Sequence, residues 1–322
     1  VRSFGYGAYV VWGDGALNAN GIGSLGLNYQ WILSSGDVLE DDVEIFYGFG
    51  GQIEKGSSKS IYFSSSNNLI YWQDYRNGTD NPQTYGTLID TEGQAYEYRL
   101  SEYSNKQFNP QIVRIDENNL FLGFYNFEGK VYYQLLNNNL ELLGESMPVY
   151  NNSVEQASSE RLPMIYSSGD GFVYYAYSQS DGIYMQKYDV LGTELWDQNK
   201  LIASNSGDNI INKIFYSQNG DLIILHDNRS FFAKEIRTTK LTNNGDIIDS
   251  WNNQIISTEN MESVYQNSIQ ISNGAFLVWY DDDDKNIYGL KLLFDSNNPS
   301  ASEVVNMSSS GYLYTNTITL DY

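Results

Sequence analysis

The sequence lacks cysteine altogether, and its 322 residues include a single histidine, His226, and five prolines. The absence of cysteine excludes disulfide bonds, thiol catalysis and Cys-ligated zinc. A single histidine excludes metal sites and mechanisms that need two or more imidazoles. No segment approaches the roughly 18 uninterrupted apolar residues that a membrane-spanning helix requires. The sequence therefore predicts no insertion into a membrane.

Basic residues are also scarce, because 18 lysines and arginines stand against 40 aspartates and glutamates, for a net charge of −22. Such a surface repels phosphate backbones and anionic membranes, so no nucleic-acid partner is expected. The acidity is consistent with simple solubility in a salty medium. It also suits a cation such as calcium, which prefers clustered carboxylate and carbonyl oxygens. Calcium is the one cofactor that the composition suggests.

Aromatic residues and glycine are plentiful, with 28 tyrosines, 14 phenylalanines and 28 glycines. Aromatic and β-branched side chains suit the pleated, half-buried surface of a sheet. No part of the chain shows a sustained helical period. The composition therefore predicts an all-β protein.

One pattern recurs along the chain at intervals of roughly 50 residues, the spacing expected of four-stranded propeller blades. It is an apolar strand that ends in an aromatic residue, a variable residue and a polar residue. The clearest copies are residues 9–14, 69–74 and 276–281, and weaker copies are 120–126, 172–178 and 222–227. Each copy ends in a polar residue; the six are Asp14, Asp74, Asn126, Ser178, Asp227 and Asp281.

A second strand and a glycine-containing turn follow each copy, most clearly at residues 183–189 with Gly192 and at 239–242 with Gly245. Alternating residues followed by such a turn are typical of antiparallel strands. Short opening and closing strands make four strands per copy. The fold predicted is one all-β domain over 1–322, a six-bladed β-propeller. Its repeats are predicted at 1–58, 59–108, 109–161, 162–211, 212–266 and 267–310.

The last residues leave an alternative open. Residues 312–314 and 317–320 have the pattern of strands beyond the sixth copy. The segment 311–322 is therefore a closing strand, the start of a further module, or the beginning of a seventh blade. Seven blades are the alternative architecture.

The run Trp72-Gln73-Asp74-Tyr75-Arg76-Asn77-Gly78, followed by residues 85–90, resembles a propeller-like repeat of secreted bacterial proteins. Units of that family combine Trp-x-Asp-x-Arg-x-Gly with an Ile-Tyr-x-Gln-Arg strand. Residues 183–187, and 279–281 with 287–292, are similar. The resemblance implies removal of a signal peptide and export to the surface or the medium, often as a module of an adhesin or an enzyme. It implies no catalytic residues, and Asn126 and Ser178 depart from its Asp.

The aspartates at the strand ends have two interpretations. Asp side chains there readily accept backbone N–H bonds and cap turns, which is the favoured role. The preceding tryptophans, Trp12, Trp72 and Trp279, are predicted to pack between blades. The alternative is a ligand site, because the loops at 13–26, 75–83 and 281–286 lie on one face of a propeller.

In a closed ring these three loops would form one acidic arc. Its candidate ligand-binding residues are Asp14, Asp74, Arg76, Asp80 and Asp281. Its candidate metal ligands are the consecutive aspartates Asp281, Asp282, Asp283 and Asp284. The competing interpretation is a solvated acidic loop, which is what runs of like charge usually are.

Catalytic patterns are weak. His226 precedes Asp227, but a Ser-His-Asp arrangement cannot be recognised in one sequence. Paired carboxylates of the glycosidase type stay open with so many acids present. The predicted function is a non-catalytic extracellular binding or scaffolding propeller with a glycan or protein ligand at the cell surface. The alternatives are a carbohydrate-active enzyme and a structural spacer without a ligand.

Overall fold

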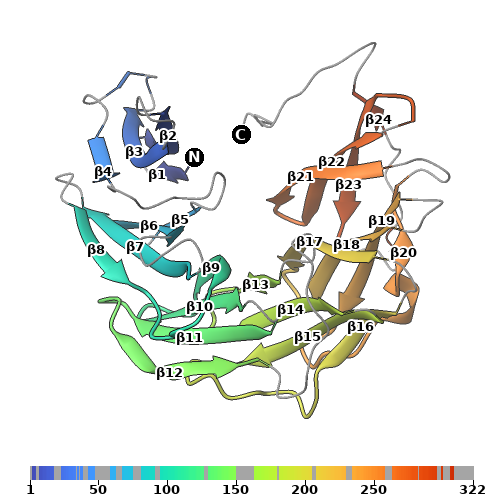
Figure 1. The fold of residues 1–322 in the computed structure, drawn as a ribbon. Coiled ribbons are helices and arrows are strands. Elements are labelled where there is room, and N and C mark those ends of the chain that lie inside the picture. The colour runs from blue at the N-terminus through green and yellow to red at the C-terminus, as the bar shows by residue number, and fades with distance from the viewer. Residues whose placement is uncertain are drawn as a thin grey trace. The chain divides into compact units, whose positions relative to one another are not determined.

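The strands of the computed structural model form six four-stranded sheets, each built from four consecutive strands (Figure 1). The structure describes residues 2–307 except 5–6, 18–22, 34, 36, 39–42, 48–58, 63–66, 75–80, 91–94, 127–129, 150–162, 180, 205–207, 230–233, 258–262, 282, 296–298 and 300–304. For most of the first sheet it describes the backbone alone. The chain divides into two compact units, which are described separately. Unit 1 is residues 1–156 with 169–173 and 190–192, and unit 2 is the remainder.

Three sheets belong to unit 1. The first comprises β1 (Arg2–Phe4), β2 (Gly7–Leu17), β3 (Gly23–Leu33) and β4 (Val43–Tyr47). The second comprises β5 (Lys59–Tyr62), β6 (Asn67–Asp74), β7 (Gln83–Asp90) and β8 (Ala95–Arg99). The third comprises β9 (Phe108–Arg114), β10 (Asn119–Tyr125), β11 (Val131–Asn137) and β12 (Leu142–Pro148).

The other three sheets belong to unit 2, except for the first residue of β14. The fourth comprises β13 (Met164–Tyr166), β14 (Val173–Gln179), β15 (Gly182–Tyr188) and β16 (Lys200–Ser204). The fifth comprises β17 (Asp208–Tyr216), β18 (Leu222–Arg229), β19 (Lys234–Leu241) and β20 (Gln254–Ile255), with a 3-10 turn η1 (Asp249–Trp251) before β20. The sixth comprises β21 (Ser263–Ile271), β22 (Gly274–Asp281), β23 (Ile287–Leu293) and β24 (Val305–Asn306).

The repeated apolar run forms the second strand of every sheet, as the sequence predicts: β2, β6, β10, β14, β18 and β22. Where side chains are described these strands are buried on both faces; six of the seven residues of β14 are buried. Burial on both faces explains why their sequences are apolar runs rather than alternating patterns. The fourth strands are far more exposed, and β12 has no buried residue.

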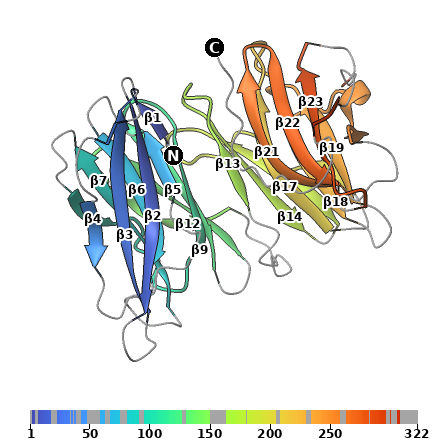
Figure 2. The same ribbon diagram turned by 90° about the horizontal axis from the view of Figure 1, so that it is seen from above.

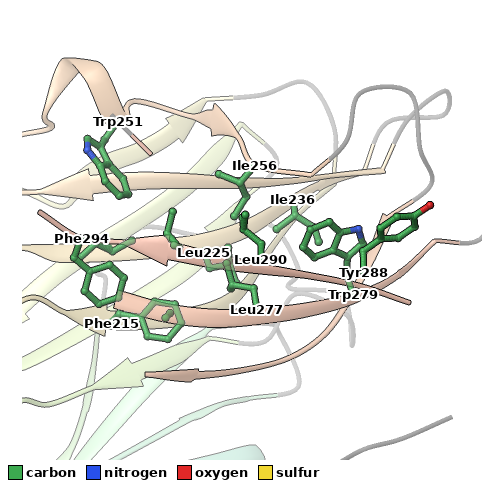
Figure 3. Close-up of a cluster of buried hydrophobic side chains, with 13 residues drawn as sticks. Phe215, Leu225, Ile236, Trp251, Ile256, Leu277, Trp279, Tyr288, Leu290 and Phe294 are labelled. Carbon is green, nitrogen blue, oxygen red and sulfur yellow. The ribbon is translucent and has the colours of Figure 1, made fainter. Parts of the chain in front are cut away.

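Buried side chains join neighbouring sheets within each unit. In unit 2, Phe215, Leu225, Trp251, Trp279 and Phe294 belong to one apolar cluster between the fifth and sixth sheets (Figure 3). Figure 2 shows β21, β22 and β23 beside β17 and β19. In unit 1 a second cluster joins the second and third sheets. It contains Leu69, Tyr71, Leu88, Leu100, Ile112, Leu120, Leu122, Phe124, Leu136 and Leu140.

The turns between third and fourth strands confirm the predicted glycine positions. Gly192 and Gly245 have φ angles of 76° and 82°, in the left-handed region that favours glycine. A Cβ atom added to Gly245 would lie 2.9 Å from the Trp196 ring, so a larger residue would also clash. Side chains close both turns, because Asp189 Oδ1 accepts the Thr193 N–H and Thr242 Oγ1 accepts the Asp246 N–H.

The all-β prediction is confirmed, and the sheets follow the predicted repeats with shifted boundaries. β17 begins at Asp208 and β21 at Ser263, whereas the repeats were expected to begin at 212 and 267. The first strands begin earlier because residues of the preceding linker join the ladder. The segment 311–322 lies outside the described residues. Among those residues no helix is long and apolar enough to cross a bilayer.

Candidate functional site

The polar residues at the ends of the second strands are buried wherever their side chains are described. Asp74, Asn126, Ser178, Asp227 and Asp281 all belong to this group. The tryptophans before Asp74 and Asp281 are buried as well, which confirms packing for Trp72 and Trp279. Side chains of Trp12 and Asp14 lie outside the description, although both residues belong to β2. A buried polar residue requires hydrogen-bond partners.

Two of these buried polar residues, Asn126 and Asp281, cap the turn that follows them. Asn126 Oδ1 accepts the Lys130 N–H at 2.9 Å, and its Nδ2 donates to the Tyr103 hydroxyl. Asp281 Oδ1 accepts the N–H groups of Asp283 and Asp284 at 2.9 and 3.3 Å. The capping role is therefore confirmed for Asp281. A ligand role for Asp74 or Asp281 remains a prediction.

The second and sixth sheets use the same Trp-x-Asp residues differently. In the second sheet, Trp72 Nε1 donates to Asp74 Oδ2 at 2.8 Å. In the sixth, Trp279 Nε1 and Asp281 Oδ2 are both buried, and neither has a hydrogen-bond partner among the residues that the structure describes. Burial raises the pKa of the Asp281 carboxyl, as do the charges of Asp284 and Asp283, against the two N–H donors that lower it.

This difference predicts unequal effects of one substitution. Trp72→Phe should lower the free energy of unfolding by about 1–2 kcal/mol more than Trp279→Phe, because it leaves the buried Asp74 carboxylate without its indole donor. The lost ring volume is the same in both variants, so each is the control for the other. Chemical denaturation of the two variants provides the measurement. Equal losses would show that the Trp72–Asp74 bond contributes nothing to stability.

The acidic loop of the sixth sheet is organised by its own hydrogen bonds. Asp284 accepts the Asn286 N–H and side-chain amide at 2.9 Å each, and the Tyr288 hydroxyl. Burial opposes ionisation of Asp284, but the bonds from Tyr288 and Asn286 outweigh it and lower the pKa. Within the described part of the chain, no group of three or more His, Asp or Glu side chains could hold a metal ion. Asp282 lies outside that part, and calcium binding remains a prediction.

The other residues of the predicted arc cannot be placed. Arg76 and Asp80 belong to residues 75–80, outside the described residues. The second sheet belongs to unit 1 and the sixth to unit 2, so the arc itself also remains a prediction.

His226 is a core residue. It lies on β18, fully buried, with Nε2 3.4 Å from Thr239 Oγ1; Nδ1 has no hydrogen-bond partner within the described part of the chain. Burial, and to a lesser extent the charge of Arg237 on β19, lowers the pKa of His226 to about 3. The ring is therefore neutral at physiological pH and shielded from solvent, so the histidine before Asp227 has a structural role.

A network of amide side chains occupies the junction of the second and third sheets. Gln83 Oε1 accepts from Arg99 Nη2 at 2.9 Å and from Gln107 Nε2 at 3.0 Å. Gln83 Nε2 donates to Asn81 Oδ1 and to the Asn105 carbonyl. Gln107 Oε1 accepts the Thr84 N–H. These bonds fix the linker that leads from β8 to β9.

The same junction supports the first strand of the third sheet. The Asn109 N–H donates to Gln73 Oε1 at 3.2 Å, and the Ile112 N–H donates to the Tyr71 hydroxyl at 3.1 Å. Tyr71 and Gln73 are two residues apart on β6 and so share one face. Side chains of the second sheet thus accept hydrogen bonds from backbone N–H groups of the third sheet. These bonds hold the beginning of β9 in a defined position.

Sequence reasoning concentrated on carboxylates and missed this amide-rich junction. One signal was available: Gln73 occupies the variable position of the Trp-x-Asp pattern, within a strand that was expected to be buried. A buried glutamine needs partners for both its amide and its carbonyl. The residues that form hydrogen bonds in this junction come from three separate chain segments: β6, the beginning of β7, and the segment from β8 to β9.

No protein-family model matches the sequence. No curated protein matches it either. Among solved structures, it is similar to the Dos1 propeller, with 11% identity and a TM-score of 0.53 over 92% of this chain and 74% of that one. It is similar to a Bacteroides fragilis protein provisionally assigned as a 6-phosphogluconolactonase, with 14% identity and a TM-score of 0.51 over 93% of this chain and 80% of that one.

An oligogalacturonate lyase solved with manganese is a third similar structure, with 10% identity and a TM-score of 0.50 over 97% of this chain and 89% of that one. At such identities the likeness shows the fold alone, because one fold hosts many functions. Together with the four-stranded antiparallel sheets, it shows that the chain has a β-propeller fold.

Proposed function

We propose that the chain is a six-bladed β-propeller that acts as a non-catalytic binding module with a glycan or protein ligand. The observation that carries the proposal is the hydrogen-bonded junction of the second and third sheets. Its amides hold the linker between β8 and β9 in place before any ligand binds. Preorganisation of this kind reduces the entropic cost of recognition.

The count of six blades is supported by the six four-stranded sheets within the described residues. A location at the bacterial surface or in the medium is supported by the repeat resemblance around Trp72 and Asp74. The acidic loop, with exposed Asp283 and Asp284 after the buried Asp281, is a second surface of the module, and calcium is its proposed cation. Each of these statements is part of the proposal.

The similar folds include proteins with enzymatic names, so a carbohydrate-active enzyme is the second candidate. A glycosidase would need two carboxylates placed across a sugar ring. In the described residues the strand-end aspartates Asp74, Asp227 and Asp281 are buried, so these three carboxylates do not suit a pair that flanks a bound sugar.

The deciding experiment is retention of the purified protein on immobilised polysaccharides, in calcium and in chelator, with an assay of released sugar. Saturable retention without released sugar is expected. A rise in melting temperature with calcium would support the acidic loop as a cation site, and an unchanged melting temperature would remove the metal from the proposal. Released sugar would place the enzyme first, and no retention would leave a protein ligand or a spacer.

A further inference from the structure

Two half-buried aromatic side chains stack at the edge of the amide-rich junction. Phe108 begins β9 and Tyr125 ends β10, and the two residues are direct cross-strand partners. Their ring centroids are 5.3 Å apart with an angle of 22° between the planes. Aromatic cross-strand pairs of this kind stabilise a sheet, but core pairs are normally covered completely. Phe108 and Tyr125 are instead only partly buried.

A β-bulge lies directly beside these rings. Between Gly123 and Tyr125 the register with β9 shifts, so that Asn109 and Pro110 together oppose the single residue Phe124. Asn109 has a φ angle of 47°, in the left-handed region that few non-glycine residues occupy. Pro110 has no N–H to lose and suits a bulge. Bulges often redirect a side chain beside a binding or catalytic site.

Asn109, the polar residue beside the rings, is held in place by a hydrogen bond to the buried side chain of Gln73. The Asn109 N–H is bonded to Gln73 Oε1, and Asn109 Nδ2 lies 3.5 Å from the Tyr125 hydroxyl. Gln73 is buried, whereas Asn109 is half-buried like the rings. A strained asparagine held by a buried glutamine places an amide at the margin of the aromatic surface.

We propose that Phe108 and Tyr125 form a stacking platform for a neutral sugar ring, with the Asn109 amide hydrogen-bonding a sugar hydroxyl. The C–H face of a sugar packs on an aromatic ring while its hydroxyls need amide or hydroxyl partners. The platform supplies both groups side by side. The net charge of −22 disfavours an anionic glycan. This inference rests on the proposed binding function and names its ligand class.

The test is calorimetric titration of the intact chain with neutral hexasaccharides of glucose, mannose and xylose, and with an oligogalacturonate. Phe108→Ala and Tyr125→Ala should each weaken binding of the preferred neutral sugar about tenfold, because each removes a stacking ring. Tyr125→Phe keeps the ring and should change affinity far less. Tyr96→Ala is the matched control, since Tyr96 on β8 is 55% exposed and lies outside the platform.

Melting temperatures identify variants that fail to fold, and in that case Phe108→Leu, which keeps volume but removes the ring, decides the outcome. Binding of a neutral sugar that survives both ring deletions would overturn the platform and leave the binding function intact. Preference for oligogalacturonate would overturn the ligand class. Absence of binding to any immobilised or soluble glycan would overturn the platform and the glycan-binding function together.

Discussion

Lys240→Met is expected to lower the free energy of unfolding by about 3 kcal/mol, since it removes one partner of a buried ion pair. Lys240 Nζ lies 3.0 Å from Asp221 Oδ2, and the two side chains are only 8% and 19% exposed. It also donates to the Phe294 carbonyl at 2.9 Å and lies 5.4 Å from the centre of the Trp251 ring. Its loss leaves a partly buried carboxylate and a carbonyl without their donor.

The location of Lys240 makes the effect large. Lys240 is on β19 of the fifth sheet, whereas Phe294 follows β23 of the sixth. The ammonium therefore joins two neighbouring sheets in unit 2. Lys187 on β15 has the same role one sheet earlier, because its Nζ donates to Asn243 Oδ1 in the turn after β19. Methionine keeps the apolar stem of lysine, so the measured loss reports the charge and its bonds.

Chemical denaturation provides the measurement, and Lys291→Met is the control. Lys291 lies on β23 with its side chain exposed, and its replacement should change stability by less than about 0.5 kcal/mol. Adding Asp221→Asn to Lys240→Met should recover part of the loss, because it removes the uncompensated charge. Equal effects of Lys240→Met and Lys291→Met would show that the buried pair contributes nothing.

The second large effect is a dependence of stability on pH through His226. The folded state holds the His226 pKa at about 3, below its ordinary value of 6.5. Between pH 3 and pH 6.5 the His226 side chain is therefore protonated in the unfolded chain and neutral in the folded chain. Stability from the neutral imidazole is complete above pH 6.5 and is lost as pH falls toward 3. The total is on the order of 5 kcal/mol.

The measurement is the difference in unfolding free energy between the parent and His226→Gln from pH 7.5 to pH 4.5. Below pH 6 the difference should move against the parent by nearly 1.4 kcal/mol per pH unit. Carboxylates, including Asp281 with its raised pKa, are present in both proteins and cancel. No other side chain of ordinary pKa titrates near pH 6.5, because the chain has one histidine. A pH-independent difference would show that His226 has the same pKa in the folded and unfolded chains.

Strands were predictable because their signal is local. The apolar run, the polar residue that ends it and the glycine turn all lie within one repeat, and six copies of the pattern reinforce one another. Residues 69–74 and 276–281 became the second strands β6 and β22. The boundaries of β17 and β21 were less predictable, since the linker residues that extend them carry no pattern of their own.

The residues of the candidate site were harder to predict from the sequence than the strands were. The strand-end aspartates were recognised as the most regular polar feature, and burial of Asp74 and Asp281 agrees with the structural role that was favoured. Sequence patterns did not indicate two features: the amides of Gln83 and Gln107, and the aromatic pair of Phe108 and Tyr125. Each depends on partners from another sheet or another strand, which no single repeat contains.

The sequence by itself determined that this protein is all-β, that it repeats a four-stranded unit, and that β6 and β22 end at Asp74 and Asp281. Periodicity and turn chemistry act between residues that are close along the chain, so they can be read from it directly. Only the tertiary structure decided that Lys240 joins two sheets, that His226 is buried and neutral, and that two half-buried rings stack beside the bulge at Asn109. Those properties arise from burial and from hydrogen bonds between distant segments, whose free energies exist only when the sheets have packed.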